Sequence, residues 1–396
     1  KKEPVKPSMT VLGKPGIGKS ACARDIANRM SAAFGFVESG EKKVAKRPVI
    51  DLTDHPSFDG DVNNVVLFYA ADLSSLLPED LNGIPKSVSQ EVCGQTMQVA
   101  SYAVQRWLAP FCVDGAIGVL CLDDLPAAAP AVQVAVRQLV LDRRVGQNKL
   151  SDGILLFVTG NRREDKSGAS TLPAHFRNAT MLLEIDTDVD SWCNWYGAQE
   201  GSAPVIGAFL RFRPSHHAKT PKDADLKGAF ATPRSWALLG KVFETAQKHG
   251  LLLDVAGGLV GEGVATELMA FINVRNALVD PATVLRDPAK ALPDVKNTLN
   301  SPDKAYAMCT GIGEVAAAWS KGTDAKLKKD AALMFMRAVG HVTSRDREYI
   351  STAVNTFTSN GGQIDALIRA AKANREDPLI KAVIDFLVSA FSKQPK

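Results

Sequence analysis

Short runs of apolar residues alternate with segments of helical periodicity through the first half of the chain. Runs that are apolar at every position are typical of strands in a parallel sheet that is covered by helices on both faces. We therefore predict an α/β domain. Its predicted strands are residues 8–12, 48–52, 65–73, 118–125, 153–161 and 181–186, and its predicted helices are residues 20–30, 88–108 and 128–142.

The segments between these elements carry turn signals. Residues 35–64 are polar and rich in Gly, Lys and Asp, and residues 75–85 are interrupted by Pro and Gly, so we predict irregular structure in both outside the strand at 48–52. Residues 143–153 contain a central Gly and predict a hairpin.

Beyond about residue 190 the strand signals fade and helical periodicity takes over. The clearest helix begins at Asp377, where apolar residues recur every three or four positions, as in a helix that docks on a core or a partner. We predict three domains, namely an α/β domain at 1–190, a helical domain at 191–290 and a helical extension at 291–396.

Composition narrows the class of protein. Of 396 residues, 45% are hydrophobic and 23% are charged, as in ordinary globular chains. No apolar run approaches the ~18 residues of a membrane span. The six cysteines include no C-x-x-C pair, which argues against a zinc or thioredoxin-type site and favours a reducing, cytoplasmic location. The chain starts at Lys1 rather than Met, as expected of a sequence whose native start has been trimmed.

Charge is unevenly placed. The net charge of +4 combines +7 in residues 1–50, +4 in residues 291–396 and −7 between them. A basic N-terminal region favours an anionic partner, but the excess is modest and a solvated basic segment explains it more simply.

A glycine-rich loop is the first motif that indicates a chemical function. Residues 13–20 fit the pattern G-x-x-x-x-G-K-[ST], between a predicted strand and a predicted helix. In that context backbone N–H groups surround phosphate oxygens, the lysine reaches the β- and γ-phosphates, and the hydroxyl holds Mg²⁺. The predicted phosphate-binding residues are Gly13, Lys14, Pro15, Gly16, Ile17, Gly18, Lys19, Ser20 and Ala21.

Polar residues end two later strands. Asp123 and Asp124 close the strand at 118–125, and we predict that Asp123 holds Mg²⁺ with Ser20 while Asp124 polarises the attacking water. Asn161 closes the strand at 153–161, where an amide would hold that water or contact the γ-phosphate. Two solvated acids and an ordinary Gly-Asn turn are the simpler alternatives.

Arg234 follows Pro233 and the possible N-cap Thr232, so it would project near the start of a helix. A plain surface arginine is the alternative.

These residues together resemble a MoxR-type AAA+ ATPase, of the kind encoded beside von Willebrand A-domain proteins. The resemblance spans residues 9–240. The matching segments are GKPGIGKS, LSSLLPEDLNGIP, GVLCLDDLPAAAPAVQVAVRQLVLDRRVG, LLFVTGNRRED, FLRFRP and ATPRSW.

The resemblance implies roles for these residues. Asp123 and Asp124 would be the Walker B acids, Asn161 sensor 1 and Arg234 sensor 2, with residues 191–290 as a helical lid. ATP and Mg²⁺ would bind between subunits of a ring, usually a hexamer, that remodels a protein client. The segment LLPEDLNGIP would belong to an insert that faces the ring pore.

Two positions depart from the family pattern. The family has Asp-Glu where this chain has Asp-Asp, so the carboxylate of Asp124 is one methylene shorter. The family also ends the segment at 172–180 with an arginine that acts on the neighbouring subunit, where this chain has Ala179. Arg177 is the nearest substitute, and Arg162 and Arg163 are rivals. Both departures predict slower hydrolysis rather than weaker binding.

Three functions therefore compete. The first is an ATP-driven remodeller of a protein client. The second is a scaffold that ATP assembles with little or no hydrolysis. The third is a nucleic-acid motor or loader, which the acidic, non-aromatic segment LSSLLPEDLNGIPK argues against.

Overall fold

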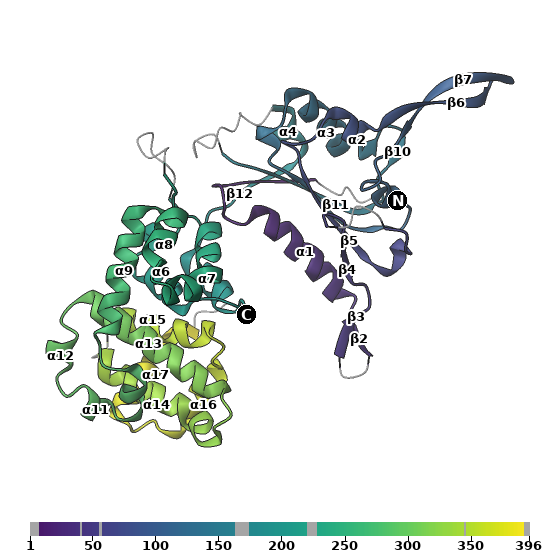
Figure 1. Ribbon diagram of the computed structural model, residues 1–396. Helices are drawn as coiled ribbons and strands as arrows, with labels where there is room; N and C mark the ends of the chain where they lie inside the picture. The colour runs from purple at the N-terminus through teal and green to yellow at the C-terminus, as the bar shows by residue number, and fades with distance from the viewer. Residues whose placement is uncertain are drawn as a thin grey trace. The chain divides into compact units, whose positions relative to one another are not determined.

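The computed structural model describes residues 8–39, 42–54, 58–162, 174–219, 228–343 and 346–391. The chain divides into two compact units, Lys1–Asp186 and Thr187–Lys396 (Figure 1). The first is an α/β P-loop domain and the second is helical, so the predicted fold class is confirmed.

A six-stranded sheet organises the first unit, in the order β12-β1-β11-β8-β5-β4, with every pairing parallel. One strand, β11, therefore lies between β1 and β8. The strands are β1 (Met9–Leu12), β4 (Val49–Asp51), β5 (Val66–Asp72), β8 (Ile117–Asp123), β11 (Gly153–Gly160) and β12 (Met181–Glu184).

Alternate residues of the central strands enter two separate cores. On one face Val119 and Phe157 pack with Ala23 and Ala27 of α1 (Lys19–Ala33). On the other face Leu120, Leu122 and Leu156 pack with Val132 and Val136 of α3 (Pro130–Asp142). Because both faces of β8 and β11 are covered, these central strands are mainly apolar, which is the pattern that identified them in the sequence.

The helix predicted at 88–108 is wrong. The structure has an antiparallel hairpin of β6 (Ile84–Val92) and β7 (Gln95–Ala103), joined by Cys93 and Gly94. Both turn residues have positive φ, 51° and 81°. A two-residue turn of this kind matches the twist of the flanking strands. Figure 1 shows the hairpin extending away from the sheet.

Two segments predicted as irregular hold regular structure. Within 75–85, a short helix α2 (Pro78–Asn82) starts at a proline, and the Asp80 carboxylate accepts a hydrogen bond from the Leu77 amide at 2.9 Å. Residues 35–64 include a second hairpin, β2 (Phe36–Ser39) with β3 (Lys42–Ala45).

The predicted hairpin at 143–153 is present as β9 (Arg144–Val145) and β10 (Asn148–Lys149). Among the described residues, the remaining elements of this unit are the 3-10 helices η1 (Val62–Asn64), η2 (Ala109–Cys112) and η3 (Leu125–Ala127) and the helix α4 (Ala174–Ala179).

The second unit is built from helices around two cores. One core surrounds Trp236 and Phe209, and the other surrounds Phe335 and Phe357. The helix predicted from Asp377 is α17 (Pro378–Phe391), and it packs on the second core through Ile380, Val383 and Leu387.

The helices that the structure describes in this unit are α5 (Val189–Gly197), α6 (Pro204–Phe212), η5 (Pro214–His216), α7 (Pro233–Lys248), α8 (Leu252–Val260), α9 (Glu262–Asn276), α10 (Pro281–Arg286), α11 (Pro288–Ala291), α12 (Val295–Thr298), α13 (Pro302–Lys321), α14 (Ala325–Thr343), α15 (Arg347–Ser359), α16 (Ile364–Ala373) and α17 (Pro378–Phe391). In the parts of the chain that the structure describes, none is long and apolar enough to cross a membrane.

Candidate nucleotide-binding site

The glycine-rich loop joins β1 to α1 and leaves the first turn of that helix without a side-chain cap. Its N-cap, Gly18, has φ 96° and makes no side-chain hydrogen bond. A Cβ atom on Gly13 would lie 2.5 Å from Ile17 Cδ1 and 2.7 Å from the Ile185 carbonyl oxygen, so only glycine fits there. The N–H groups and the positive dipole end of α1 therefore face the space that the loop encloses, as an anion site requires.

Lys19 connects this loop to the end of β11. Its side chain is buried, with the whole residue 8% exposed. The ammonium donates to the carbonyl oxygens of Gly13 and Lys14, each at 2.9 Å, and to Asn161 Oδ1 at 2.8 Å. These hydrogen bonds hold the Lys19 ammonium against the glycine-rich loop, where a cation can bind an anion.

Ser20 and Asp123 are also in direct contact. The Ser20 hydroxyl donates to Asp123 Oδ2 at 2.7 Å, which links the start of α1 to the end of β8. The other carboxylate oxygen, Oδ1, accepts a hydrogen bond from the Thr159 hydroxyl of β11. The Asp123 carboxylate is thus held from two sides.

Asp124 lies next to Asn161 and has an unusual backbone conformation. Its φ and ψ are 57° and 45°, in the left-handed region that aspartate tolerates better than most residues. Its carboxylate accepts a hydrogen bond from Asn161 Nδ2 at 3.3 Å. Burial, followed by the negative charge of Asp123, raises the pKa of Asp124, while Lys19 opposes the shift.

The donor set fits Mg²⁺. A hydroxyl and a carboxylate within 2.7 Å of each other are hard oxygen ligands, which Mg²⁺ prefers together with phosphate oxygens and water. Among the described residues, no group of three or more His, Cys, Asp or Glu side chains could hold a metal ion. Ser20 and Asp123 would hold the ion, which would supply charge neutralisation for phosphate oxygens.

The structure brings together Lys19, Ser20, Asp123, Asp124 and Asn161, all of which the sequence identified. They meet because β1, β8 and β11 are parallel neighbours, so their carboxyl ends lie at one edge of the sheet.

The arginines that the sequence identified lie in different parts of the chain. Arg177 is exposed on α4, and Arg234 is exposed at the second position of α7, in the second unit. Thr232 caps α7 as predicted, since its hydroxyl accepts from the Ser235 amide at 3.1 Å. Arg162 is half-buried beside Asn161, and Arg163 lies outside the described residues.

Sequence reasoning missed two residues of this edge. Thr159 contacts both acids, and Asp72, the last residue of β5, pairs in register with Asp123. The charge of Asp72 also contributes to the raised pKa of Asp124. Asp72 follows the apolar run at 65–71, so its position at a strand end was the signal that would have identified it.

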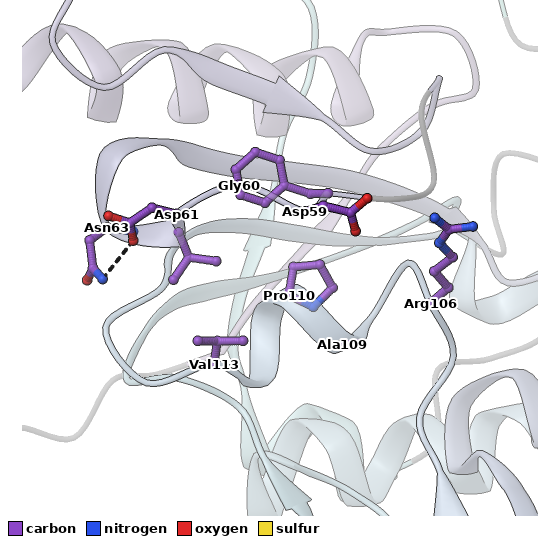
Figure 2. Close-up of a pocket in the computed structure, with 10 residues that line it drawn as sticks. Asp59, Gly60, Asp61, Asn63, Arg106, Ala109, Pro110 and Val113 are labelled. Carbon is purple, nitrogen blue, oxygen red and sulfur yellow. Dashed lines mark hydrogen bonds between the residues drawn. The ribbon is translucent and has the colours of Figure 1, made fainter.

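A separate cavity of about 450 Å³ lies at the opposite end of the sheet. Figure 2 shows it between the segment before β5, with Asp59 and Asp61, and the segment before β8, with Arg106, Pro110 and Val113. No residue of the glycine-rich loop lines it. This cavity is therefore distinct from the candidate nucleotide site.

The sequence matches no protein-family model and no curated protein. Among solved structures, the chain resembles a mutant of RuvB from Thermotoga maritima at 14% identity, over 76% of this chain and 79% of that one, with a TM-score of 0.31. It also resembles PCH-2 from C. elegans at 13% identity, over 68% of this chain and 56% of that one, with a TM-score of 0.26. A third similar structure is that of a DNA replication initiation factor, at 12% identity, over 98% of this chain and 89% of that one, with a TM-score of 0.27.

Proposed function

We propose that this chain is an AAA+ ATPase of the MoxR type, which binds ATP with Mg²⁺ and hydrolyses it at the interfaces of a ring, most simply a hexamer. The observation that carries the proposal is the hydrogen-bonded set at the sheet edge. Lys19, Asn161 and Asp124 form one chain of contacts, and Ser20 and Asp123 form a second beside it.

Each of these groups has a distinct role in the proposal. The loop amides and Lys19 bind the phosphates, and Lys19 exchanges its bonds to the loop carbonyls for bonds to phosphate oxygens. Asp124 accepts the proton of the attacking water, and Asn161 orients that water. The raised pKa of Asp124 is consistent with a base, because it makes the carboxylate a better proton acceptor.

The remaining parts of the proposal rest on the sequence resemblance. They are a helical lid at 191–290 that carries Arg234, a neighbouring subunit acted on by Arg177, a protein client of the von Willebrand A-domain class, and a cytoplasmic location. Arg177 and Arg234 are both exposed, which is compatible with contacts to nucleotide that is bound by another subunit or by the other unit of the chain.

A second candidate is a scaffold that ATP assembles without efficient turnover. It is favoured by the short Asp124 side chain and by Ala179 at the position of the expected arginine. Binding of ATP is common to both candidates, whereas hydrolysis separates them.

The first test is nucleotide binding by Lys19→Ala. Removing a buried ammonium that makes three hydrogen bonds should abolish ATP binding or weaken it at least 100-fold, because charge-assisted bonds contribute about 1.5–3 kcal/mol each. Lys46→Ala is the matched control, since Lys46 is an exposed lysine in the same unit. Calorimetric titration gives both affinities, and equal ATP affinity in Lys19→Ala and the wild type would refute the site.

The second test is steady-state hydrolysis of ATP over a range of protein concentrations, with the mass determined at each. Turnover that rises as oligomers form supports the ring ATPase, and assembly without turnover supports the scaffold. Stimulation by added DNA or RNA would instead support a nucleic-acid motor.

A further inference from the structure

Thr159 occupies a central place in the sheet edge described above. It lies on β11 and is fully buried, with no exposed surface. On one side it pairs in register with Val11 of β1, and on the other side its neighbour Val158 pairs with Leu122, the residue before Asp123. Its side chain therefore lies between the strand that leads into the glycine-rich loop and the strand that carries the acids.

The Thr159 hydroxyl donates a hydrogen bond to one of the two acids and accepts a hydrogen bond from the other. Its proton goes to Asp123 Oδ1, and its oxygen accepts the backbone N–H of Asp124 at 3.1 Å. A hydroxyl donates one hydrogen bond, so the donor is committed to Asp123. No solvent reaches this residue to replace either bond.

These two bonds have separate consequences. The first leaves Asp123 Oδ2 to face Ser20, since Oδ1 is already occupied. The second anchors the amide of Asp124, whose left-handed backbone turns the chain sharply after β8 and brings its carboxylate to Asn161. One side chain thus sets the orientation of both acids.

We propose that Thr159 is a positioning residue for the metal-binding carboxylate, through the bond to Asp123, and for the base, through the amide of Asp124. This inference rests on the proposed function, because it assigns Ser20 and Asp123 to Mg²⁺. Residues that orient a metal ligand typically account for 10- to 100-fold in metal affinity.

A purely structural role for Thr159 predicts something different, and Thr10 provides the comparison. Thr10 is also fully buried, lies on the adjacent strand β1, and bonds the Thr180 hydroxyl at 2.8 Å, away from the acids. If loss of a buried hydroxyl only weakened the sheet, Thr159→Val and Thr10→Val would behave alike.

The experiment measures ATP affinity by calorimetric titration in excess EDTA and in saturating Mg²⁺, for the wild type, Thr159→Val, Thr159→Ser, Thr10→Val and Lys19→Ala. The readout is the ratio of the two affinities, which needs no hydrolysis. We expect the ATP affinity of Thr159→Val in EDTA to stay within about twofold of the wild type. Its ratio of the affinity in Mg²⁺ to the affinity in EDTA should be about tenfold lower than that of the wild type. Thr159→Ser, which keeps the hydroxyl, and Thr10→Val should retain the wild-type ratio.

Several results would overturn the inference. They are a wild-type ratio in Thr159→Val, a loss in Thr159→Ser as large as that in Thr159→Val, an equal loss in Thr10→Val, and no effect of Mg²⁺ on the wild type. If circular dichroism shows that Thr159→Val does not fold, Thr159→Cys, with a weakly bonding group of similar size, takes its place in the same comparison. Failure of the proposed function is distinguishable, because the wild type would then bind ATP no better than Lys19→Ala.

Discussion

Lengthening the side chain at position 124 by one methylene, in the Asp124→Glu variant, is expected to raise the rate of ATP hydrolysis. The carboxylate of Asp124 reaches Asn161 only at 3.3 Å, at the long end of a hydrogen bond. An added methylene extends the reach of the carboxylate by about 1.5 Å. Because misplacement by about 1 Å can cost ~100-fold in rate, the gain in turnover has a ceiling near 100-fold.

The same substitution should cost stability. Residue 124 has φ 57° and ψ 45°, and glutamate lacks the short polar side chain that makes this region tolerable for aspartate. A left-handed backbone costs a typical residue roughly 1–2 kcal/mol, and because aspartate avoids much of this cost we expect glutamate to lose about 1 kcal/mol. In a unit of this size, a loss of about 1 kcal/mol lowers the melting temperature by roughly 2–4 °C.

The assay is steady-state release of phosphate at saturating Mg²⁺-ATP, at a protein concentration where the oligomer is constant. Asp124→Asn is the matched control, because asparagine has the same shape and tolerates the same backbone but accepts no proton. Its turnover should fall by about 10²- to 10⁴-fold with nucleotide binding retained. Turnover in Asp124→Glu at or below the wild-type rate would refute the reasoning and indicate a site adapted to aspartate.

Two further predictions concern charge. In the pH profile of turnover, the pH at which activity falls on the acid side should lie above the ordinary pKa range of aspartate, because burial and Asp123 raise the pKa of Asp124 and protonation removes the base. The variant Asp72→Asn removes a negative charge that also raises this pKa, so it should move the acid side of the profile to lower pH. An unchanged profile would contradict this prediction. Arg275→Met should lower the free energy of unfolding by about 3–5 kcal/mol in urea titrations, because it leaves the Glu314 carboxylate, 11% exposed, without its partner. The deficit should narrow as the pH falls, since burial raises the pKa of Glu314 and protonation removes the unpaired charge. The double variant Arg275→Met/Glu314→Leu should recover most of the loss.

The parts of the site that could be predicted from the sequence are those set by local chain geometry. The spacing of residues 13–20 fixes a strand, a tight loop and a helix start within one short segment, so Lys19 and Ser20 follow from the pattern alone. Asp123 and Asn161 each follow an apolar strand, and parallel neighbours end at the same edge. These predictions needed no knowledge of which strands are adjacent.

The hairpin of β6 and β7 could not be predicted in the same way, because its residues are largely exposed. On a solvated ribbon, the usual contrast between a buried and a solvent-facing side is weak, so the alternation of Val88 and Val92 with polar residues also suits a helix face. The decisive signal was the turn, where Gly94 accepts a positive φ readily and Cys93 is an uncommon choice beside it. A turn with Asn-Gly would have identified the hairpin.

Thr159 escaped prediction for a different reason, which bears on how the site is built. A threonine inside an apolar strand is ordinary, and its importance depends on the strand order that places β11 beside β8 and on the register that sets Val158 opposite Leu122. A register shift of one residue would turn the hydroxyl to the other face of the sheet and leave the Asp124 amide without its acceptor. The acids are therefore defined by local sequence, whereas their orientation is a property of the assembled sheet. It follows that substitutions in the core on the same face of the sheet as Thr159, such as at Phe157, should alter the Mg²⁺ dependence of nucleotide binding before they alter binding itself.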